Sequence, residues 1–227
     1  MSILGTRVVR VEDPRFLTGQ GTYIANLDLP GAVHVTYVRS TMAHARILSI
    51  DTSEAEAMPG VLHVWTAKDV DLAPASADMR MLNQAMKFPF LAIDTVRYVG
   101  DLVAMVISEE KAQGVDAAEM VIVDYDPLPA VIDVDESLRG DVILHPEAGT
   151  NVVLTFANDD ERDIFADCDV VVELTIENNK VATAPLEVRS VASRWDGDRL
   201  TQWACSQGAH GARDGLARVL GVDPANV

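Results

Sequence analysis

Apolar residues recur along the first 140 residues in short runs, some with the two-residue period of a strand and others with a helical period. The runs of strand type cover residues 33–39, 61–66, 102–107 and 121–125. The runs that suit helices cover residues 54–58, after a polar Asp-Thr-Ser cap, and residues 109–120. Short strands mixed with short helices predict an α+β fold, and the strand–helix–strand succession over 102–125 predicts a right-handed crossover in a mixed sheet.

The predicted strand at 33–39 alternates apolar and polar residues, which is typical of a strand with one buried side. Val33, Val35 and Tyr37 share one side of that strand, so we expect this side to face the core.

The N-terminal residues 3–23 mix Pro, Gly and charged residues without any period, which predicts an irregular, ordered arm or an ordinary loop. Gly19 and Gly21 form a Gly-x-Gly pair in this stretch. The pair lacks a preceding strand, a third glycine and a following helix, so it is not a dinucleotide-binding fingerprint.

The stretch at 133–151 is acidic, contains Pro and Gly and has no period, which predicts a link between two domains. We place the arm and a first domain at residues 1–140, and a second domain at residues 141–227. In the second domain, apolar runs predict strands at 152–156 and 169–177, on either side of a short helix that starts near Asp159.

The C-terminal part of the chain predicts a hairpin followed by a helix. Two β-prone runs, 188–195 and 200–204, flank the turn signal Asp-Gly-Asp, because Asp and Gly tolerate the backbone angles of a tight hairpin loop. A run with apolar residues at helical spacing then extends to Leu220. Gln207 therefore lies at a strand-to-helix junction, and such junctions commonly hold ligands in α/β folds.

The composition excludes some classes of partner. The chain has 35 Asp and Glu against 18 Lys and Arg, a formal net charge of −17. Nucleic acids and anionic membranes need basic patches, so this balance argues against both as partners, and it favours solubility. Two cysteines, Cys168 and Cys205, form neither a CxxC pair nor a disulfide framework. Without a long apolar run or a signal-peptide layout, the chain is expected to be cytoplasmic.

Two groups of residues invite a metal-binding interpretation. His44 has no second His, Cys or carboxylate at ligand spacing, so a hydrogen-bonded structural histidine is the better interpretation. The acidic cluster Asp159-Asp-Glu-x-Asp163 does not fit a calcium-loop pattern, whereas acidic residues are common where a helix starts. We therefore assign no metal ligand and no catalytic residue to this chain.

Several separated motifs resemble the large subunit of the molybdenum hydroxylases, the family of xanthine dehydrogenase, aldehyde oxidase and carbon monoxide dehydrogenase. Three of them are the Ala-Pro-Leu-Glu-Val-Arg string that ends at Arg189, the Ala-Ser-Arg-Trp-Asp string that ends at Asp196, and the Leu-Thr-Gln-Trp-Ala-Cys-Ser-Gln string that ends at Gln207. The Arg-Tyr-Val-Gly string that precedes Asp101 is a further match. The arm resembles the opening motif of the same subunit. Three pieces occur in the family's order and register, which makes the resemblance fairly specific.

The resemblance implies a fold, a cofactor and partners. It implies an α/β hammerhead domain followed by the first part of a molybdopterin-binding domain, with Gln207 contacting the molybdenum–molybdopterin centre. Glu187 and Arg189 match the Pro-Leu-Glu-x-Arg element. Asp101 stands where the family commonly has Gln, and Lys180 where it often has Arg. The family enzyme oxidises an aldehyde, an N-heterocycle or a similar small molecule, and passes electrons to iron–sulfur and flavin subunits or domains.

Family large subunits continue for several hundred residues, through a glycine-rich element and a catalytic glutamate. We therefore expect a split or fragmentary large subunit that is inactive alone, retains no cofactor and joins the remaining large-subunit part, with a homodimer also open. The alternative is a docking or assembly module. A half-subunit should expose an apolar patch on its second domain, and a self-contained module should not. An ordinary hydrolase lacks support, because no Gly-x-Ser-x-Gly element is present.

Overall fold

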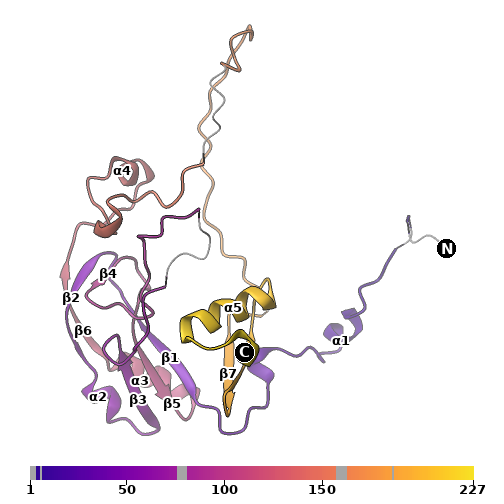
Figure 1. Ribbon diagram of the computed structural model, residues 1–227, viewed down its shortest axis with the longest axis vertical. Coiled ribbons are helices and arrows are strands. Elements are labelled where there is room, and N and C mark those ends of the chain that lie inside the picture. Colours follow the sequence, from indigo (N-terminus) through magenta and orange to yellow (C-terminus); the bar gives the residue numbers. More distant parts are fainter. Residues whose placement is uncertain (1–3, 6, 76–80, 157–162, 186) are drawn as a thin grey trace. The chain divides into compact units, whose positions relative to one another are not determined.

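The computed structural model describes residues 4–5, 7–75, 81–156, 163–185 and 187–227. These residues form two compact units. Figure 1 shows the chain coloured along its sequence, from indigo at the N-terminus to yellow at the C-terminus. We call Gly31–Val171 the two-sheet unit. The second unit, which we call the hairpin unit, combines Met1–Pro30 with Val172–Val227. The domain boundary expected near residue 140 stays a prediction.

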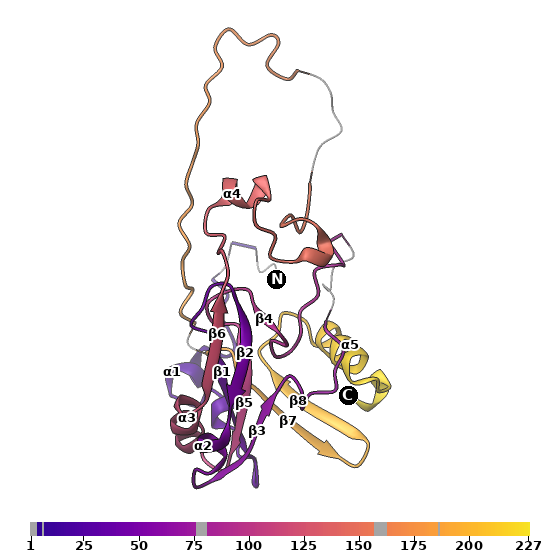
Figure 2. The ribbon, with the colours of Figure 1, turned by 90° about the vertical axis from the view of Figure 1, so that its left-hand side faces the viewer.

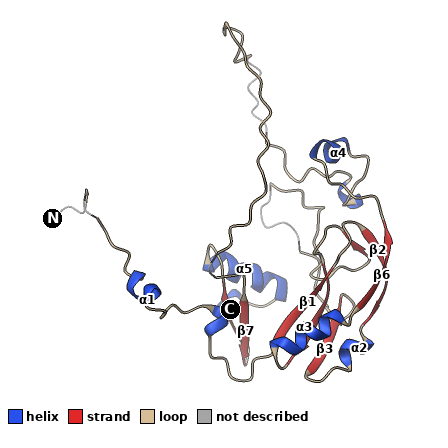
Figure 3. Cartoon of the chain, turned by 180° about the vertical axis from the view of Figure 1, so that it is seen from behind, coloured by secondary structure: helices blue, strands red, loops and turns tan. Residues whose placement is uncertain are grey.

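The two-sheet unit contains two three-stranded antiparallel sheets. The first has the order β1 (His34–Arg39), β5 (Leu102–Ser108) and β3 (Val61–Thr66). The second has the order β4 (Thr95–Val96), β2 (Ala45–Asp51) and β6 (Ile122–Pro127). The helices that pack against the first sheet are α2 (Ser53–Glu56) and α3 (Lys111–Glu119), which Figure 3 shows in blue beside β1 and β3.

The α+β class is confirmed, but the predicted crossover in a mixed sheet is wrong. Strands β5 and β6 belong to different sheets, and every strand pair in the described ranges is antiparallel. The reason is that β1 and β3 already occupy both edges of β5. The chain that leaves α3 therefore pairs with β2 instead, with Ile47 opposite Tyr125.

The core of the first sheet lies on the side that α2 and α3 cover. Val38, Val64, Ala104 and Val106 are buried there together with Ala117 of α3. The expectation that Val33, Val35 and Tyr37 face the core is therefore wrong, since their exposed fractions are 50%, 49% and 43%. The alternation of β1 identifies two faces correctly, but it does not tell which of the two the helices cover.

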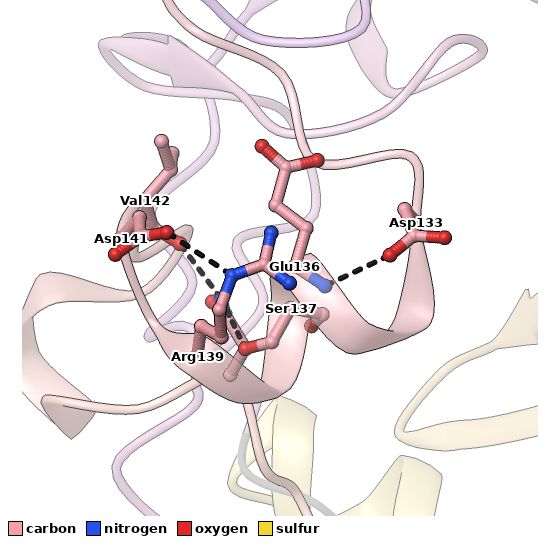
Figure 4. A network of polar contacts seen from close by, with 7 residues as sticks. Asp133, Glu136, Ser137, Arg139, Asp141 and Val142 are labelled. Atoms are coloured by element: carbon pink, nitrogen blue, oxygen red, sulfur yellow. Dashed lines mark hydrogen bonds and ion pairs between the residues drawn. The ribbon is translucent and has the colours of Figure 1, made fainter.

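The stretch 133–151 is more regular than the predicted linker. It contains helix α4 (Val134–Arg139) and a 3₁₀ turn, Pro146–Ala148. The side chain of Asp133 accepts a hydrogen bond from the backbone N–H of Glu136 at 2.9 Å, and Figure 4 shows this cap at the start of the helix. Gly140 ends α4 with φ of 74°, a left-handed conformation that glycine adopts without strain.

Three predicted elements follow this stretch. Residues 152–156 and 169–177 are described and form no strand, so both strand predictions are wrong. The helix expected near Asp159 lies outside the described residues. No backbone hydrogen bond reaches residues 169–177 from any other described part of the chain, which explains why their alternating pattern does not produce a strand here.

The hairpin unit confirms the predicted hairpin and helix. Strands β7 (Val191–Asp196) and β8 (Arg199–Ala204) pair antiparallel around a two-residue loop, in which Gly197 has φ of 61°. Helix α5 (Ala209–Leu220) follows, as Figure 2 shows in yellow. The predicted arm is less irregular than expected, because it contains helix α1 (Asp13–Leu17). A 3₁₀ turn, η1 (Ile24–Asn26), follows that stretch directly, and from here on the arm means the N-terminal part of this unit up to Pro30. A second 3₁₀ turn, η3 (Pro224–Asn226), comes after α5.

Candidate functional site

The predicted junction at Gln207 is confirmed as a place in the fold. Strand β8 ends at Ala204, helix α5 begins at Ala209, and Gln207 lies exposed in the short connection between them. In the described parts of the chain, its side-chain amide makes no hydrogen bond. The carboxamide therefore has both its donor and its acceptor free for a ligand.

The first turn of α5 is also open. Its N-cap residue is Gly208, which supplies no side-chain cap, so the first N–H groups of the helix have no side-chain acceptor from that residue. A Cβ atom placed on Gly208 or on Gly211 would meet no atom within 4 Å. Free N–H groups at a helix start, with space beside them and the Gln207 amide next to them, suit an anionic or oxygen-rich group.

The connection 205–208 stays close to the segment that precedes β7. The last strand pair of the hairpin is Val191 with Ala204. Beyond it, the Sγ atom of Cys205 lies 3.7 Å from the carbonyl oxygen of Val188. The two segments thus remain neighbours after the regular ladder ends, and this contact places Glu187 and Val188 beside the base of the junction.

Glu187 connects this base to the N-terminal arm. Its Oε1 atom accepts a hydrogen bond of 3.0 Å from the backbone N–H of Ile24. Arm and hairpin together line a depression of about 400 Å³, which we call the arm–hairpin depression. Its lining residues are Thr22, Tyr23, Ile24, Leu27, Glu187, Gln202, Trp203, Ala204 and Cys205.

The backbone just before Glu187 carries a strained residue. Ala184 has φ of 42°, and it is the one non-glycine residue in the described ranges with a positive φ. Alanine adopts this region at a cost because of its Cβ atom, and Pro185 restricts the preceding residue further. Residues held in this way cluster at functional sites, so the strain supports a role for this segment.

The other residues singled out from the sequence have structural roles or no contact. His44 is buried, and its Nδ1 atom lies 2.7 Å from the carbonyl oxygen of Pro129, which confirms the structural interpretation. Asp101 accepts hydrogen bonds from the backbone N–H groups of Arg97 and Leu102 at 3.0 and 3.1 Å. Arg189 and Lys180 are exposed.

Asp101 also affects a neighbouring phenol. Partial burial raises the pKa of Tyr98, and the negative charge of Asp101 adds to this effect. Sequence reasoning did not identify the Glu187–Ile24 contact either, because nothing in the local pattern relates residues that are 163 positions apart.

No group of three or more His, Cys, Asp or Glu residues in the described ranges is arranged to hold a metal ion. The calcium-type cluster that begins at Asp159 lies largely outside the described residues. In the same ranges, no helix is both long enough and apolar enough to cross a bilayer.

Two family models match the chain. Residues 18–129 match the aldehyde oxidase and xanthine dehydrogenase a/b hammerhead domain, and residues 144–227 match the molybdopterin cofactor-binding domain. The chain is 36% identical over 231 residues to the nicotine 6-hydroxylase large subunit of Paenarthrobacter nicotinovorans. That alignment covers 98% of this chain and 28% of the relative.

Two further proteins are similar over almost the whole chain. The carbon monoxide dehydrogenase large chain of Afipia carboxidovorans is 32% identical over 96% of this chain and 29% of its own length. The crystal structure of quinoline 2-oxidoreductase from Pseudomonas putida 86 superposes with a TM-score of 0.88 and 34% identity. It covers 99% of this chain and 30% of that chain, so the present sequence spans less than a third of the length of each of these proteins.

Proposed function

The chain belongs to the large subunits of the molybdenum hydroxylases, and from that premise we propose that it supplies part of the molybdopterin-binding site of such an oxidoreductase. The observation that carries the proposal is the junction between β8 and α5. There, a free Gln207 carboxamide stands beside an open first helical turn. We propose that Gln207 contacts the molybdenum–molybdopterin group.

The residues at this junction fit such a group because they donate hydrogen bonds and add a partial positive charge. Gln207 would donate a hydrogen bond from its carboxamide N–H to an oxygen of the group. The partial positive charge at the N-terminal end of α5 would stabilise the negative charge of the group. When bound, the group would supply the two-electron oxidation of a small molecule with a water-derived oxygen. One side chain and one helix end do not enclose a cofactor, so we propose that the isolated chain retains none and is inactive.

An exposed apolar run supports assembly with further polypeptide. Val170, Val172, Leu174 and Ile176 alternate with polar residues from Glu173 onward, and their exposed fractions are 78%, 83%, 77% and 78%. A strand pattern with an uncovered apolar side is unfavourable in water, and a polypeptide that packed on that side would remove it from solvent. This observation favours the half-subunit hypothesis over a self-contained docking module.

The proposed partners and substrate follow from the family. The similar proteins are named for nicotine, carbon monoxide and quinoline. We propose that the assembled enzyme oxidises an aldehyde, an N-heterocycle or a similar small molecule in the cytoplasm. It would pass electrons to iron–sulfur and flavin subunits. The remaining large-subunit polypeptide would be its first partner, and we propose a second copy of the assembly as a further one.

The test compares the chain alone with the chain co-expressed with the remaining subunits. Molybdenum analysis and dye reduction with an aldehyde or an N-heterocycle are measured on both. The chain alone should hold no molybdenum, and the assembly should hold it stoichiometrically. In the assembly, Gln207→Ala should reduce turnover by about a hundredfold, as the loss of a hydrogen-bond donor at a reacting centre does.

The matched control is Gln20→Ala, which removes an exposed glutamine from the arm and should leave turnover unchanged. Stoichiometric molybdenum on the chain alone would contradict the proposed incompleteness. Unchanged turnover and unchanged metal content in Gln207→Ala would contradict the proposed role of Gln207.

A further inference from the structure

The carboxylate of Glu187 joins two segments of the hairpin unit that are 163 residues apart. Its acceptor oxygen lies 3.0 Å from the backbone nitrogen of Ile24, and the contact is partly buried. A hydrogen bond from a backbone N–H to a carboxylate is stronger than one between neutral groups, and partial burial shields it from competing water. Glu187 therefore restrains the arm at the start of η1.

The arm is restrained at a position where its backbone is already regular. Ile24 is the first residue of η1, and this turn is closed by a hydrogen bond of 3.1 Å from the Leu27 N–H to the Ile24 carbonyl oxygen. A second one, of 2.9 Å, joins the Asn26 N–H to the carbonyl oxygen of Tyr23. The Ile24 N–H belongs to the first residue of this turn, where N–H groups have no partner within the turn, and Glu187 accepts its hydrogen bond.

The other end of the restraint is the base of the hairpin. Glu187 is adjacent to Val188, whose carbonyl oxygen is 3.7 Å from the Sγ atom of Cys205. Glu187 and Cys205 also line the arm–hairpin depression together with Ile24. Cys205 begins the connection that carries Gln207, so the arm, Glu187 and this connection form one continuous set of contacts.

We propose that Glu187 is a positioning residue for Gln207: by holding Ile24, it clamps the arm against the base of the hairpin and fixes the 205–208 connection. The cofactor contact of Gln207 rests on the proposed function, whereas the restraint by Glu187 does not. The restraint itself is a property of the chain without any cofactor.

The first experiment measures amide hydrogen exchange on the full 227-residue chain. Glu187→Ala removes the acceptor and should speed exchange by about tenfold in η1 and at Ala212, whose N–H donates a hydrogen bond of 3.2 Å to the carbonyl oxygen of Gly208 in the 205–208 connection. Tenfold is about the factor expected from losing one charge-assisted hydrogen bond. Glu187→Gln has a side chain of the same length and keeps an oxygen acceptor on Cδ. It should therefore restore exchange to within about threefold of the wild type.

A second variant removes the donor instead of the acceptor. Ile24→Pro lacks the backbone N–H, and proline is tolerated there because Ile24 is the first residue of a helical turn. The preceding residue, Tyr23, is already extended with φ of −115° and ψ of 159°, as a residue before proline should be. Ile24→Pro should speed exchange at Ala212 as Glu187→Ala does, and the double variant should add nothing further.

The internal control is exchange in β5 of the two-sheet unit, which should be unchanged in all four variants and shows that the chain remains folded. Faster exchange in η1 with unchanged exchange at Ala212 would overturn the proposal. So would additive effects of Ile24→Pro and Glu187→Ala, because the two changes would then act on different interactions.

The assembled enzyme provides the second readout. There, Glu187→Ala should lower kcat more than it raises KM, and Glu187→Gln should restore kcat. Failure of rescue by Glu187→Gln would overturn the positioning role. If the exchange results hold but Gln207→Ala leaves turnover and metal content unchanged, the proposed cofactor contact fails while the clamp by Glu187 stands.

Discussion

The Nδ1 atom of His44 lies 2.7 Å from the carbonyl oxygen of Pro129, and the carbonyl oxygen of His44 accepts a hydrogen bond of 2.9 Å from the N–H of Leu128. His44 precedes β2 and these two partners follow β6, so the contacts extend the pairing of the two strands. Because a carbonyl oxygen only accepts hydrogen bonds, the bond to Pro129 fixes the proton on Nδ1.

Replacing His44 tests this structural role. His44→Ala should lower the free energy of unfolding by about 1–2 kcal/mol, since it removes the hydrogen bond and the packing of a buried ring. His44→Asn should retain more of the stability, because its amide nitrogen can take the place of Nδ1. Chemical denaturation of both variants is the measurement, and an equal loss in the two would contradict the role of the bond.

Two helical glycines should respond oppositely to alanine. A Cβ atom at Gly114 of α3 would lie 2.6 Å from the Oγ atom of Ser108 and 2.7 Å from Oγ1 of Thr36. The Ser108 hydroxyl is held by its hydrogen bond to the Glu110 carbonyl oxygen, so it cannot rotate away without a cost. Gly114→Ala should therefore destabilise the chain by about 1–2 kcal/mol, in spite of the better helix propensity of alanine.

The matched control is Gly215 in α5, where an added Cβ atom would meet nothing within 4 Å. Gly215→Ala should stabilise α5 by about 0.5–1 kcal/mol, because alanine restricts the unfolded chain without a steric conflict. Thermal and urea unfolding of the two variants provide the comparison. A stabilising Gly114→Ala would show that α3 packs less closely on β1 and β5 than described.

The turn after β3 should make stability depend on pH. The carboxylate of Asp69 accepts hydrogen bonds from the backbone N–H and the hydroxyl of Thr66 at 2.8 and 3.0 Å. The backbone bond first, and the hydroxyl bond second, lower the pKa of Asp69 from its ordinary value of 3.8. A lowered pKa in the folded state contributes stability above 3.8, and this contribution is lost as the pH falls through the folded value.

The measurement is the urea midpoint at about pH 5.5 and about pH 3. The urea midpoint of the wild type should be lower at the acidic pH than at the higher one. The midpoint of Asp69→Asn should decrease less, because an amide does not titrate in this range. The same decrease in both proteins would refute the assignment to Asp69.

A single asparagine should hold the stretch around α4 in place. The Oδ1 atom of Asn151 accepts the N–H of Leu144 at 2.9 Å, and its Nδ2 donates to the carbonyl oxygens of Val142 and Ser137 at 2.7 and 3.3 Å. Asn151→Asp keeps the first bond but places a carboxylate oxygen against two carbonyl oxygens. It should destabilise this stretch by about 1–3 kcal/mol.

Amide exchange over residues 134–151 checks this prediction, with Asp141→Asn as the control. Asp141 forms an exposed ion pair of 3.4 Å with Arg139, which Figure 4 shows, and such pairs contribute little to stability. Exchange should rise in Asn151→Asp and remain near the wild type in Asp141→Asn. Equal rates in Asn151→Asp and the wild type would contradict the anchoring role.

Local signals in the sequence predicted the elements that depend on neighbours in the chain. The hairpin at 191–204 follows from alternation around Asp-Gly-Asp, and α3 and α5 follow from helical spacing. Signals at α4 were also present, since Asp133 can cap and Gly140 can end a helix, but the acidic composition of the stretch concealed them.

Long-range pairing could not be predicted in the same way. The alternation in β1 does not say which of its faces meets α3, and the run at 121–125 does not say that it pairs with β2 instead of joining the sheet of β5. The candidate site shows the same division. Gln207 was found from a local junction, whereas the partner of Glu187 depends on how the arm returns to the hairpin.

The hairpin unit consists of the first thirty residues and the last part of the chain, whereas the two-sheet unit is continuous between them. A ribosome releases the chain from its N-terminus, so Gly31–Val171 can fold as soon as it has emerged. The Ile24 N–H has no Glu187 acceptor until 163 further residues have been made. Over that interval the segment around Ile24 lacks the contact that restrains it in the folded hairpin unit, so we expect it to be more open to proteases than it is after folding.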